Sequence, residues 1–293
     1  MDNTKLSTEF QKLDVDYLYH LGLDTTMDLK AQFGGIKHVV FTRSFASSDQ
    51  ISNLLTSEFY GINDIKIHCE VIAKDERYHL HKVAHTLVVS HGVGFPSMLI
   101  CLNEITKLLF HAGATDFNFY RVGPAGGVGI SEDNVIIASE ALSPELKPEW
   151  KNIEFGEYYS YSTQMKPDLT NKLIYANKDN GSIINGKVLS SANFYEGQAR
   201  LNGAIAPSFN KVQRDAYLQQ AHEAGVRAID MESACFTAFC KNMDIPATMI
   251  LPIVVDRLCD NDQEPVITAD QTRVSPIMVT ASKILSNLLI TTL

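Results

Sequence analysis

The chain has 293 residues, 45% of them hydrophobic and 20% charged, and a formal net charge of −9. This composition is typical of a globular protein with a sizeable core. The negative charge and the lack of a Lys/Arg-rich run argue against a nucleic-acid-binding protein. The five cysteines are scattered without a CxxC pair, which favours reduced thiols and a cytoplasmic location.

The N-terminal residues and the composition along the chain indicate how many domains to expect. Residues 1–15 are polar and charged, and they predict a loose N-terminal arm with no signal peptide. No apolar run is long enough to span a bilayer. Because no repeat, low-complexity tract or linker divides the chain, the sequence predicts one domain over residues 1–293.

The first half of the chain predicts alternating strands and helices. Runs of apolar and β-branched residues predict strands at 36–41, 65–72, 86–90 and 117–122. Apolar residues at helical spacing predict a helix through Ile51 to Leu55 and a long helix over 95–114. A glycine-rich segment, 123–127, follows the fourth strand and predicts a loop.

Three histidines, His79, His81 and His85, stand between the second and third of these strands. His79 and His81 would share one strand face, as metal ligands can, but the sequence shows no nearby carboxylate or cysteine that completes a ligand set. Solvated histidines are the simpler interpretation, so the sequence predicts no metal site.

The second half of the chain continues the same alternation. Strands are predicted at 133–142, 188–193, 227–230 and 247–255, and helices at 166–180, 212–224, 234–243 and 275–289. Strands alternating with helices predict an α/β fold, with a central twisted mixed sheet flanked by helices.

The segment Asn193–Arg200 carries chemistry that suggests a ligand. Gln198 and Arg200 stand two residues apart, so an extended backbone would direct both side chains to one target. An amide and a guanidinium fork suit a flat ring with carbonyls and one N–H, such as uracil. Phe194 and Tyr195 would supply a stacking face. A solvated polar turn is the alternative interpretation.

This segment resembles the uracil-recognition segment of the uridine phosphorylases, the pyrimidine branch of the nucleoside phosphorylase superfamily. Other landmarks are similar to that family and stand in its order: Asp16–His20, Glu76–Tyr78, Ser90–Ser97, Arg121–Gly127 and Gly225–Ser233. The resemblance extends to about Arg257. It implies a nucleoside phosphorylase-like fold and a homo-oligomer, a dimer or a hexamer, with active sites at subunit interfaces.

The resemblance implies roles for residues at the phosphate end of the site. Arg121 would be costly to bury without an anion, and its position matches the principal phosphate ligand. Arg77 matches an arginine that crosses the subunit interface to contact phosphate. His20 matches a histidine that crosses it to bond the ribose 5′-hydroxyl, although in isolation it would be an ordinary surface or packed histidine.

The nucleoside contacts implied by the resemblance come from the second half of the chain. Met231 would lie under the sugar, and Glu232 would bind the ribose 2′- and 3′-hydroxyls. Without the family, a carboxylate at this strand-to-helix junction would only complement the helix dipole. The residues implied for the uracil ring are Phe194, Gln198, Arg200 and Arg257.

Several positions depart from the family pattern for phosphate. Thr42 and Ser47 stand where the family has the glycine and the arginine of its phosphate loop. Pro124 replaces a threonine that bonds phosphate and ribose, and proline offers neither an N–H nor a hydroxyl. Arg43 is the candidate replacement for the loop arginine, while Ser44 and its neighbouring serines would cap the next helix or hold an anion.

Asp256 is a further departure, because uridine phosphorylases usually have a neutral residue at this position. The purine-specific bacterial branch has an aspartate about here that protonates the purine leaving group. The alternative interpretation is an exposed Asp256–Arg257 pair that contributes little.

The sequence therefore predicts reversible phosphorolysis of uridine to uracil and ribose 1-phosphate in pyrimidine salvage. Phosphate is the co-substrate, and no cofactor is expected. Catalysis by Arg121, Glu232, Gln198 and Arg200 would rest on positioning and on charge stabilisation. The main alternative is a weakly active or inactive paralogue that binds nucleoside. Hydrolysis, or a purine preference through Asp256, is a further alternative.

Overall fold

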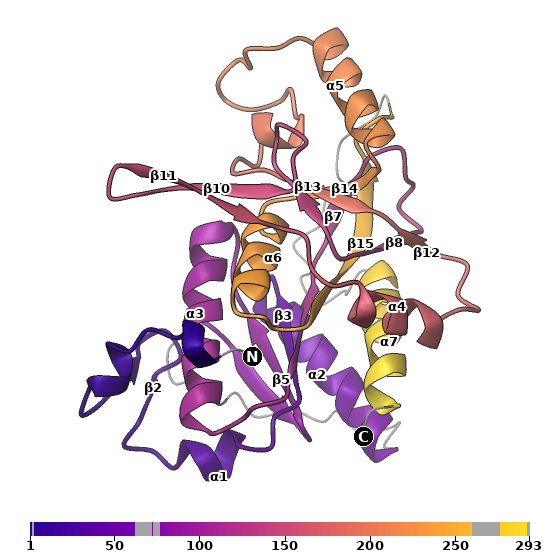
Figure 1. Cartoon of the computed structure of the whole chain (residues 1–293). Coiled ribbons are helices and arrows are strands. Elements are labelled where there is room, and N and C mark those ends of the chain that lie inside the picture. Colours follow the sequence, from indigo (N-terminus) through magenta and orange to yellow (C-terminus); the bar gives the residue numbers. More distant parts are fainter. Residues whose placement is uncertain (2, 62–71, 73–76, 260–275, 292–293) are drawn as a thin grey trace.

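A computed structural model describes residues 1, 3–61, 72, 77–259 and 276–291. Figure 1 shows a twisted central sheet with helices on both sides. The predicted α/β class, a mixed sheet flanked by helices, is confirmed. No helix in the described ranges is long and apolar enough to cross a membrane.

The first half of the sheet is built from short apolar strands. They are β3 (His38–Thr42), β4 (Leu80–Val83), β5 (Thr86–Ser90) and β6 (Asn118–Val122). Every residue of β3 and β5 is buried, as expected for strands covered on both faces. β3 runs parallel to β5 and β6, whereas β4 runs antiparallel to β5.

The second half of the sheet contains one long strand and several short ones. They are β7 (Ala125–Gly127), β8 (Val135–Ala138), β9 (Ala141–Leu142), β12 (Ile183–Asn185), β13 (Lys187–Ser190), β14 (Val226–Asp230) and β15 (Ala247–Asp256). The order is β4-β5-β3-β6-β15-β7-β14-β13-β9, and β8 pairs with β15 and β12. β15 therefore joins the two halves.

Helices cover the two faces of the sheet over separate hydrophobic cores (Figure 1). One face carries α2 (Phe45–Tyr60), α4 (Asp168–Ala176) and α7 (Pro276–Ile290). The other carries α1 (Leu29–Phe33), α3 (Phe95–His111) and α6 (Ser233–Asn242). α5 (Lys211–Glu223) packs with β13 and β14 over a third, smaller cluster.

Local chemistry explains where the helices begin and end. α2 begins after Ser44, whose hydroxyl accepts a hydrogen bond from the Ser47 N–H at 3.3 Å, as predicted for a capping serine. Asn210 and Gln213 form a capping box at the start of α5. Gly225, with φ of +93°, follows α5 in the left-handed region that glycine adopts without strain.

The structure also contains elements that the sequence did not predict. The segment 133–142 is two strands, β8 and β9, not one. A hairpin of β10 (Glu149–Glu154) and β11 (Glu157–Ser162) projects from the sheet (Figure 1). Most residues of β11 are exposed and none in β10 is fully buried, so neither strand has the apolar, buried residues that predict a strand from sequence. The strand predicted at 65–72 lies outside the described residues except for its last position.

The polar N-terminal arm contains only short elements. Two turns of 3₁₀ helix, η1 (Asn3–Lys5) and η2 (Phe10–Lys12), precede a small hairpin of β1 (Tyr17–Leu18) and β2 (Leu23–Asp24).

The glycine-rich segment predicted as a loop contains a central strand, β7. A Cβ atom at Gly127 would lie 2.3 Å from the Ile130 carbonyl oxygen, and one at Gly126 would lie 2.9 Å from Nε of Arg257. Only glycine fits at such close approaches. The strand was missed because these glycines give no hydrophobic signal.

Candidate active site

Three parallel strands end at one edge of the sheet and bring polar side chains together there. β5, β3 and β6 are neighbours in register, and Thr42, His91 and Arg121 lie at or near their carboxyl ends. Thr42 Oγ1, both ring nitrogens of His91 and Nε of Arg121 are buried without a hydrogen-bond partner among the described residues. Such unpaired groups are costly, so this edge is suited to receive a polar ligand.

His91 was not among the residues predicted for the site. Burial, with the guanidinium groups of Arg121 and Arg43 nearby, lowers the pKa of His91 well below its usual value. The imidazole is therefore neutral at pH 7, with one donor and one acceptor. His91 stands within the motif Ser90–Ser97, but the residue type alone does not distinguish a site histidine from a packed one.

Arg121 is fully buried and lies between two carboxylates. Its Nη1 lies 2.7 Å from Oδ2 of Asp230, and its Nη2 lies 2.6 Å from Oε2 of Glu232. Burial alone would lower the pKa of Arg121, but the two carboxylates outweigh it and raise that pKa. Burial also raises the pKa of Asp230, against the opposing effect of Arg121. The anion partner expected for Arg121 is thus supplied within the chain, partly by Asp230, which the sequence analysis did not single out.

Glu232 holds two elements together. Its Oε1 accepts a hydrogen bond from the backbone N–H of Gly94 at 2.6 Å, at the start of α3. The side chain makes no capping hydrogen bond to α6, the helix that it precedes. Glu232 therefore does more than complement a helix dipole, because it links the Arg121 ion pair to the turn before α3.

The segment with Gln198 and Arg200 is a turn, so the expected extended backbone was wrong. Residues Glu196–Gln198 form a 3₁₀ turn, and Ala199 follows with φ of +62°. The Tyr195 carbonyl accepts hydrogen bonds from the N–H groups of both Gln198 and Arg200, at 3.1 and 2.9 Å. These bonds favour the turn over a strand.

The turn is not solvated, which contradicts the alternative interpretation of this segment. Gln198 and Arg200 are only 7% and 6% exposed. The guanidinium carbon of Arg200 lies 4.1 Å from the centre of the Phe194 ring, a stacked arrangement that orients the guanidinium.

One small cavity lies where these segments meet. Its volume is about 60 Å³, and its lining includes Asp230, Pro124 and five of the predicted residues: Arg43, Phe194, Gln198, Met231 and Glu232. The lining combines a cation, a carboxylate pair, an amide and an aromatic ring. This set can hold an anion beside a polar planar ring.

Comparison with known proteins accounts for this arrangement. Residues 46–290 match the phosphorylase superfamily. Human uridine phosphorylase 2 is 35% identical over 86% of this chain and 81% of its own length. The chain belongs to the uridine phosphorylase family.

Two further relatives come from Schistosoma mansoni. The crystal structure of its uridine phosphorylase in complex with uracil superposes with a TM-score of 0.89 at 28% identity, covering 98% of this chain and 99% of that one. Its inactive uridine phosphorylase B is 31% identical over 86% of both chains. The family thus includes both a uracil-binding member and a protein named as inactive.

His20, predicted to bond the ribose 5′-hydroxyl, and Arg77, predicted to contact phosphate, lie outside the cavity of their own chain. The ring Nδ1 of His20 lies 2.7 Å from Oε1 of Glu104, and the Glu104 carboxylate also accepts from the His20 backbone N–H. Arg77 is exposed. Both positions are compatible with the family pattern in which these residues serve a neighbouring subunit, and their roles stay predictions.

Arg257 and Asp256 do not form the exposed pair considered as an alternative. Arg257 is fully buried, with its side chain packed against Gly126 of β7. The Asp256 carboxylate accepts hydrogen bonds from the N–H groups of Gly129 and Leu258 at 2.9 and 3.0 Å. These bonds give Asp256 a structural role in a turn, apart from the residues that line the cavity.

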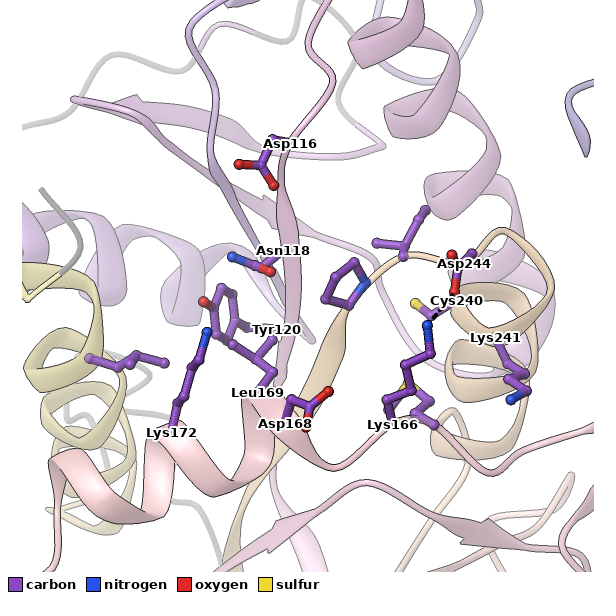
Figure 2. A pocket seen from close by; sticks show the side chains of 14 residues that line it. Asp116, Asn118, Tyr120, Lys166, Asp168, Leu169, Lys172, Cys240, Lys241 and Asp244 are labelled. Carbon is purple, nitrogen blue, oxygen red and sulfur yellow. Dashed lines mark hydrogen bonds and ion pairs between the residues drawn. The ribbon is translucent and has the colours of Figure 1, made fainter. Parts of the chain in front are cut away.

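A larger cavity, of about 460 Å³, lies elsewhere in the fold (Figure 2). Asp116, Asn118 and Pro246 place it at the amino ends of β6 and β15, the edge opposite the carboxyl end of β6. Figure 2 shows lysine and aspartate side chains around it, including the Lys166–Asp244 pair at 3.3 Å. None of the residues predicted for uridine or phosphate lines it, so the smaller cavity is the candidate active site.

Proposed function

We propose that this chain catalyses the reversible phosphorolysis of uridine to uracil and ribose 1-phosphate. The observation that carries the proposal is one cavity lined by Gln198, Met231, Glu232 and Arg43, beside buried Arg121. These are the residue types that the reaction needs for a base, a sugar and an anion. Membership of the uridine phosphorylase family supports the same assignment.

The reaction would proceed by positioning and electrostatic stabilisation. Arg43 and Arg121 would hold phosphate so that one oxygen attacks the anomeric carbon as the N-glycosidic bond breaks. The bonding electrons move onto the uracil ring, where the Gln198 amide and Arg200 would stabilise the negative charge. Glu232 would bind the ribose hydroxyls, and Met231 would contact the sugar ring. No metal or organic cofactor has a role in this scheme.

The second candidate is a nucleoside-binding paralogue with little turnover. Two observations favour it: Asp230 and Glu232 already pair with the charge of Arg121, and Pro124 lines the cavity where a hydroxyl is expected. Losing a charge-assisted hydrogen bond costs about 1.5–3 kcal/mol, a factor of roughly 10–150 in affinity. Phosphate binding is therefore the step that separates the two candidates.

We also propose that the enzyme is a homo-oligomer, a dimer or a hexamer, that works in pyrimidine salvage in the cytosol. A cavity of about 60 Å³ is smaller than the roughly 300–1,000 Å³ usual for a ligand pocket, so a partner subunit would complete its walls. The residues for this are Arg77 and His20, which lie outside the cavity of their own chain. The four described cysteines are free, which suits a reducing compartment.

The deciding experiment measures uracil release from uridine with and without phosphate. A phosphorylase releases uracil only when phosphate is present, and ribose 1-phosphate accumulates in equal amount. Uridine binding in a calorimeter without any release would favour the inactive paralogue. Release without phosphate would indicate hydrolysis, and release of a purine base from inosine would restore the purine alternative.

The replacement role of Arg43 has its own test. Arg43 is the only cation among the described residues that line the cavity. Changing it to alanine is therefore expected to raise the KM for phosphate by roughly 10–150-fold. The KM for uridine should change little, and it serves as the internal control in steady-state assays. An unchanged KM for phosphate would show that Arg43 does not bind the anion.

A further inference from the structure

The structure places a carboxylate, that of Asp49, beside His79 and His81, for which the sequence showed no further metal ligand. Asp49, in the second turn of α2, lies beside His81 of β4 and beside His79, the residue before β4. The ligand atoms of Asp49, His79 and His81 all lie within 4.8 Å of one another. A helix and a strand therefore supply two imidazoles and one carboxylate at a single point.

The distances within this cluster fit a metal ion. Asp49 Oδ1 lies 2.9 Å from Nε2 of His81 and 3.8 Å from Nδ1 of His79. A tetrahedral zinc ion with bonds of about 2.0–2.1 Å separates its ligand atoms by roughly 3.3 Å. The two measured separations lie on either side of that value, so small side-chain adjustments would complete the coordination.

Burial and packing hold the two imidazoles in place. The His81 side chain is 2% exposed and that of His79 is 25% exposed. The Phe45 ring stacks on the His79 ring with centroids 3.6 Å apart and planes 4° apart. The backbone of His79 exchanges hydrogen bonds with Ser90 of the neighbouring strand, both at 2.9 Å. Ligands fixed in this way lose little conformational entropy when they bind an ion.

The hydrogen bonding of the cluster is incomplete without a ligand. Nδ1 of His79, the ring nitrogen that faces Asp49, is buried and has no hydrogen-bond partner in the described ranges. The Asp49 oxygen lies within hydrogen-bond distance of Nε2 of His81, at 2.9 Å, but 3.8 Å from Nδ1 of His79 is too long for a hydrogen bond. A cation between the three groups would satisfy the carboxylate and both facing nitrogens together.

We propose that Asp49, His79 and His81 form a binding site for a divalent transition-metal ion of the zinc class. Two imidazoles with one carboxylate suit zinc, cobalt or nickel, whereas magnesium and calcium prefer oxygen ligands. The Asp49 side chain is half-exposed, which leaves the fourth position for water. The ion would link α2 to the start of β4. Arg43 and Arg77 stand just before these two elements in the sequence. The site does not depend on the proposed reaction.

The test uses tag-free protein treated with a chelator and then titrated with Co²⁺. The wild type is expected to bind one Co²⁺ per chain with the visible absorption of a tetrahedral ion, and Zn²⁺ should displace it. Zn²⁺ should also raise the thermal unfolding midpoint by roughly 5 °C at a hundredfold excess over its Kd. Mg²⁺ should do neither.

Matched variants locate the ion. The double variant His79→Gln/His81→Gln should lose both the Co²⁺ band and the Zn²⁺ shift, while Asp49→Asn should weaken binding by more than about 10–100-fold. His85→Gln is the control, because the exposed His85 ring contacts the Gly35 carbonyl at 2.9 Å instead. Circular dichroism without metal verifies that each variant is folded. A wild type with neither response, or a folded double variant that keeps both, would overturn the proposal.

Discussion

Replacing Arg121 with alanine is expected to lower the free energy of unfolding by about 3–5 kcal/mol. The substitution leaves Asp230 and Glu232 buried at 3% and 6% exposure without the guanidinium that lies between them. Uncompensated buried carboxylates are among the most destabilising changes known for a single residue. Urea denaturation followed by circular dichroism measures the effect.

A second substitution distinguishes this cause from simple loss of packing. Asp230→Asn in the Arg121→Ala background removes one of the two unpaired charges, so the double variant should recover part of the lost stability. The same Asp230→Asn change in the wild type should destabilise, because it weakens the ion pair. Additive effects, or a loss below about 1 kcal/mol for Arg121→Ala, would contradict the buried-charge account.

The same ion-paired cluster affects how activity data should be interpreted. Loss of uracil release in Arg121→Ala would follow from unfolding as well as from a missing phosphate ligand. Arg121→Lys keeps the positive charge but replaces the planar guanidinium with a single ammonium group. It therefore tests whether contact with two carboxylates and phosphate at once requires the planar fork of arginine. Assays on this variant belong at a temperature where its folded fraction has been measured.

Much of the fold followed from local patterns in the sequence. The runs at 86–90 and 247–255 are strands within one residue of the predicted limits, because apolar β-branched residues mark buried strands. Patterns of this kind say nothing about β7, whose role in the sheet depends on the absence of side chains. They also missed the β10–β11 hairpin, in which no residue is fully buried.

The candidate site was harder to predict because its partners are distant in the chain. Single residues such as Glu232 and Gln198 could be chosen from their motifs. The pairing of Arg121 with Asp230 and Glu232 spans more than a hundred residues, and only the fold brings these groups together. Asp49 was missed for the same reason, since 32 residues separate it from His81. The turn at Gln198 depends on hydrogen bonds to the Tyr195 carbonyl, which no pattern of side-chain types encodes.

Changing Gln198 to leucine is expected to lower kcat/KM for uridine by about 100-fold, or roughly 2.7 kcal/mol. Leucine has a similar size but neither donates nor accepts, so the variant loses both hydrogen bonds proposed for the uracil edge, including the one that strengthens as charge develops on the ring. Steady-state uracil release measures the loss. The KM for phosphate should stay within about twofold, because Arg43 and Arg121, not Gln198, are the residues proposed to bind the anion.

A second glutamine serves as the control for the general effect of replacing an amide side chain with leucine. Gln219 is exposed on α5, where its amide bonds Glu223 at 3.0 Å, and Gln219→Leu should leave kcat/KM unchanged. If Gln198→Leu behaves like this control, the turn at 196–198 is not the base-recognition element. If kcat/KM falls for uridine and the uracil Kd rises in parallel, the amide contacts the base in both the bound and the reacting state. A fall in kcat with an unchanged uracil Kd would instead confine its role to the charge that develops as the glycosidic bond breaks.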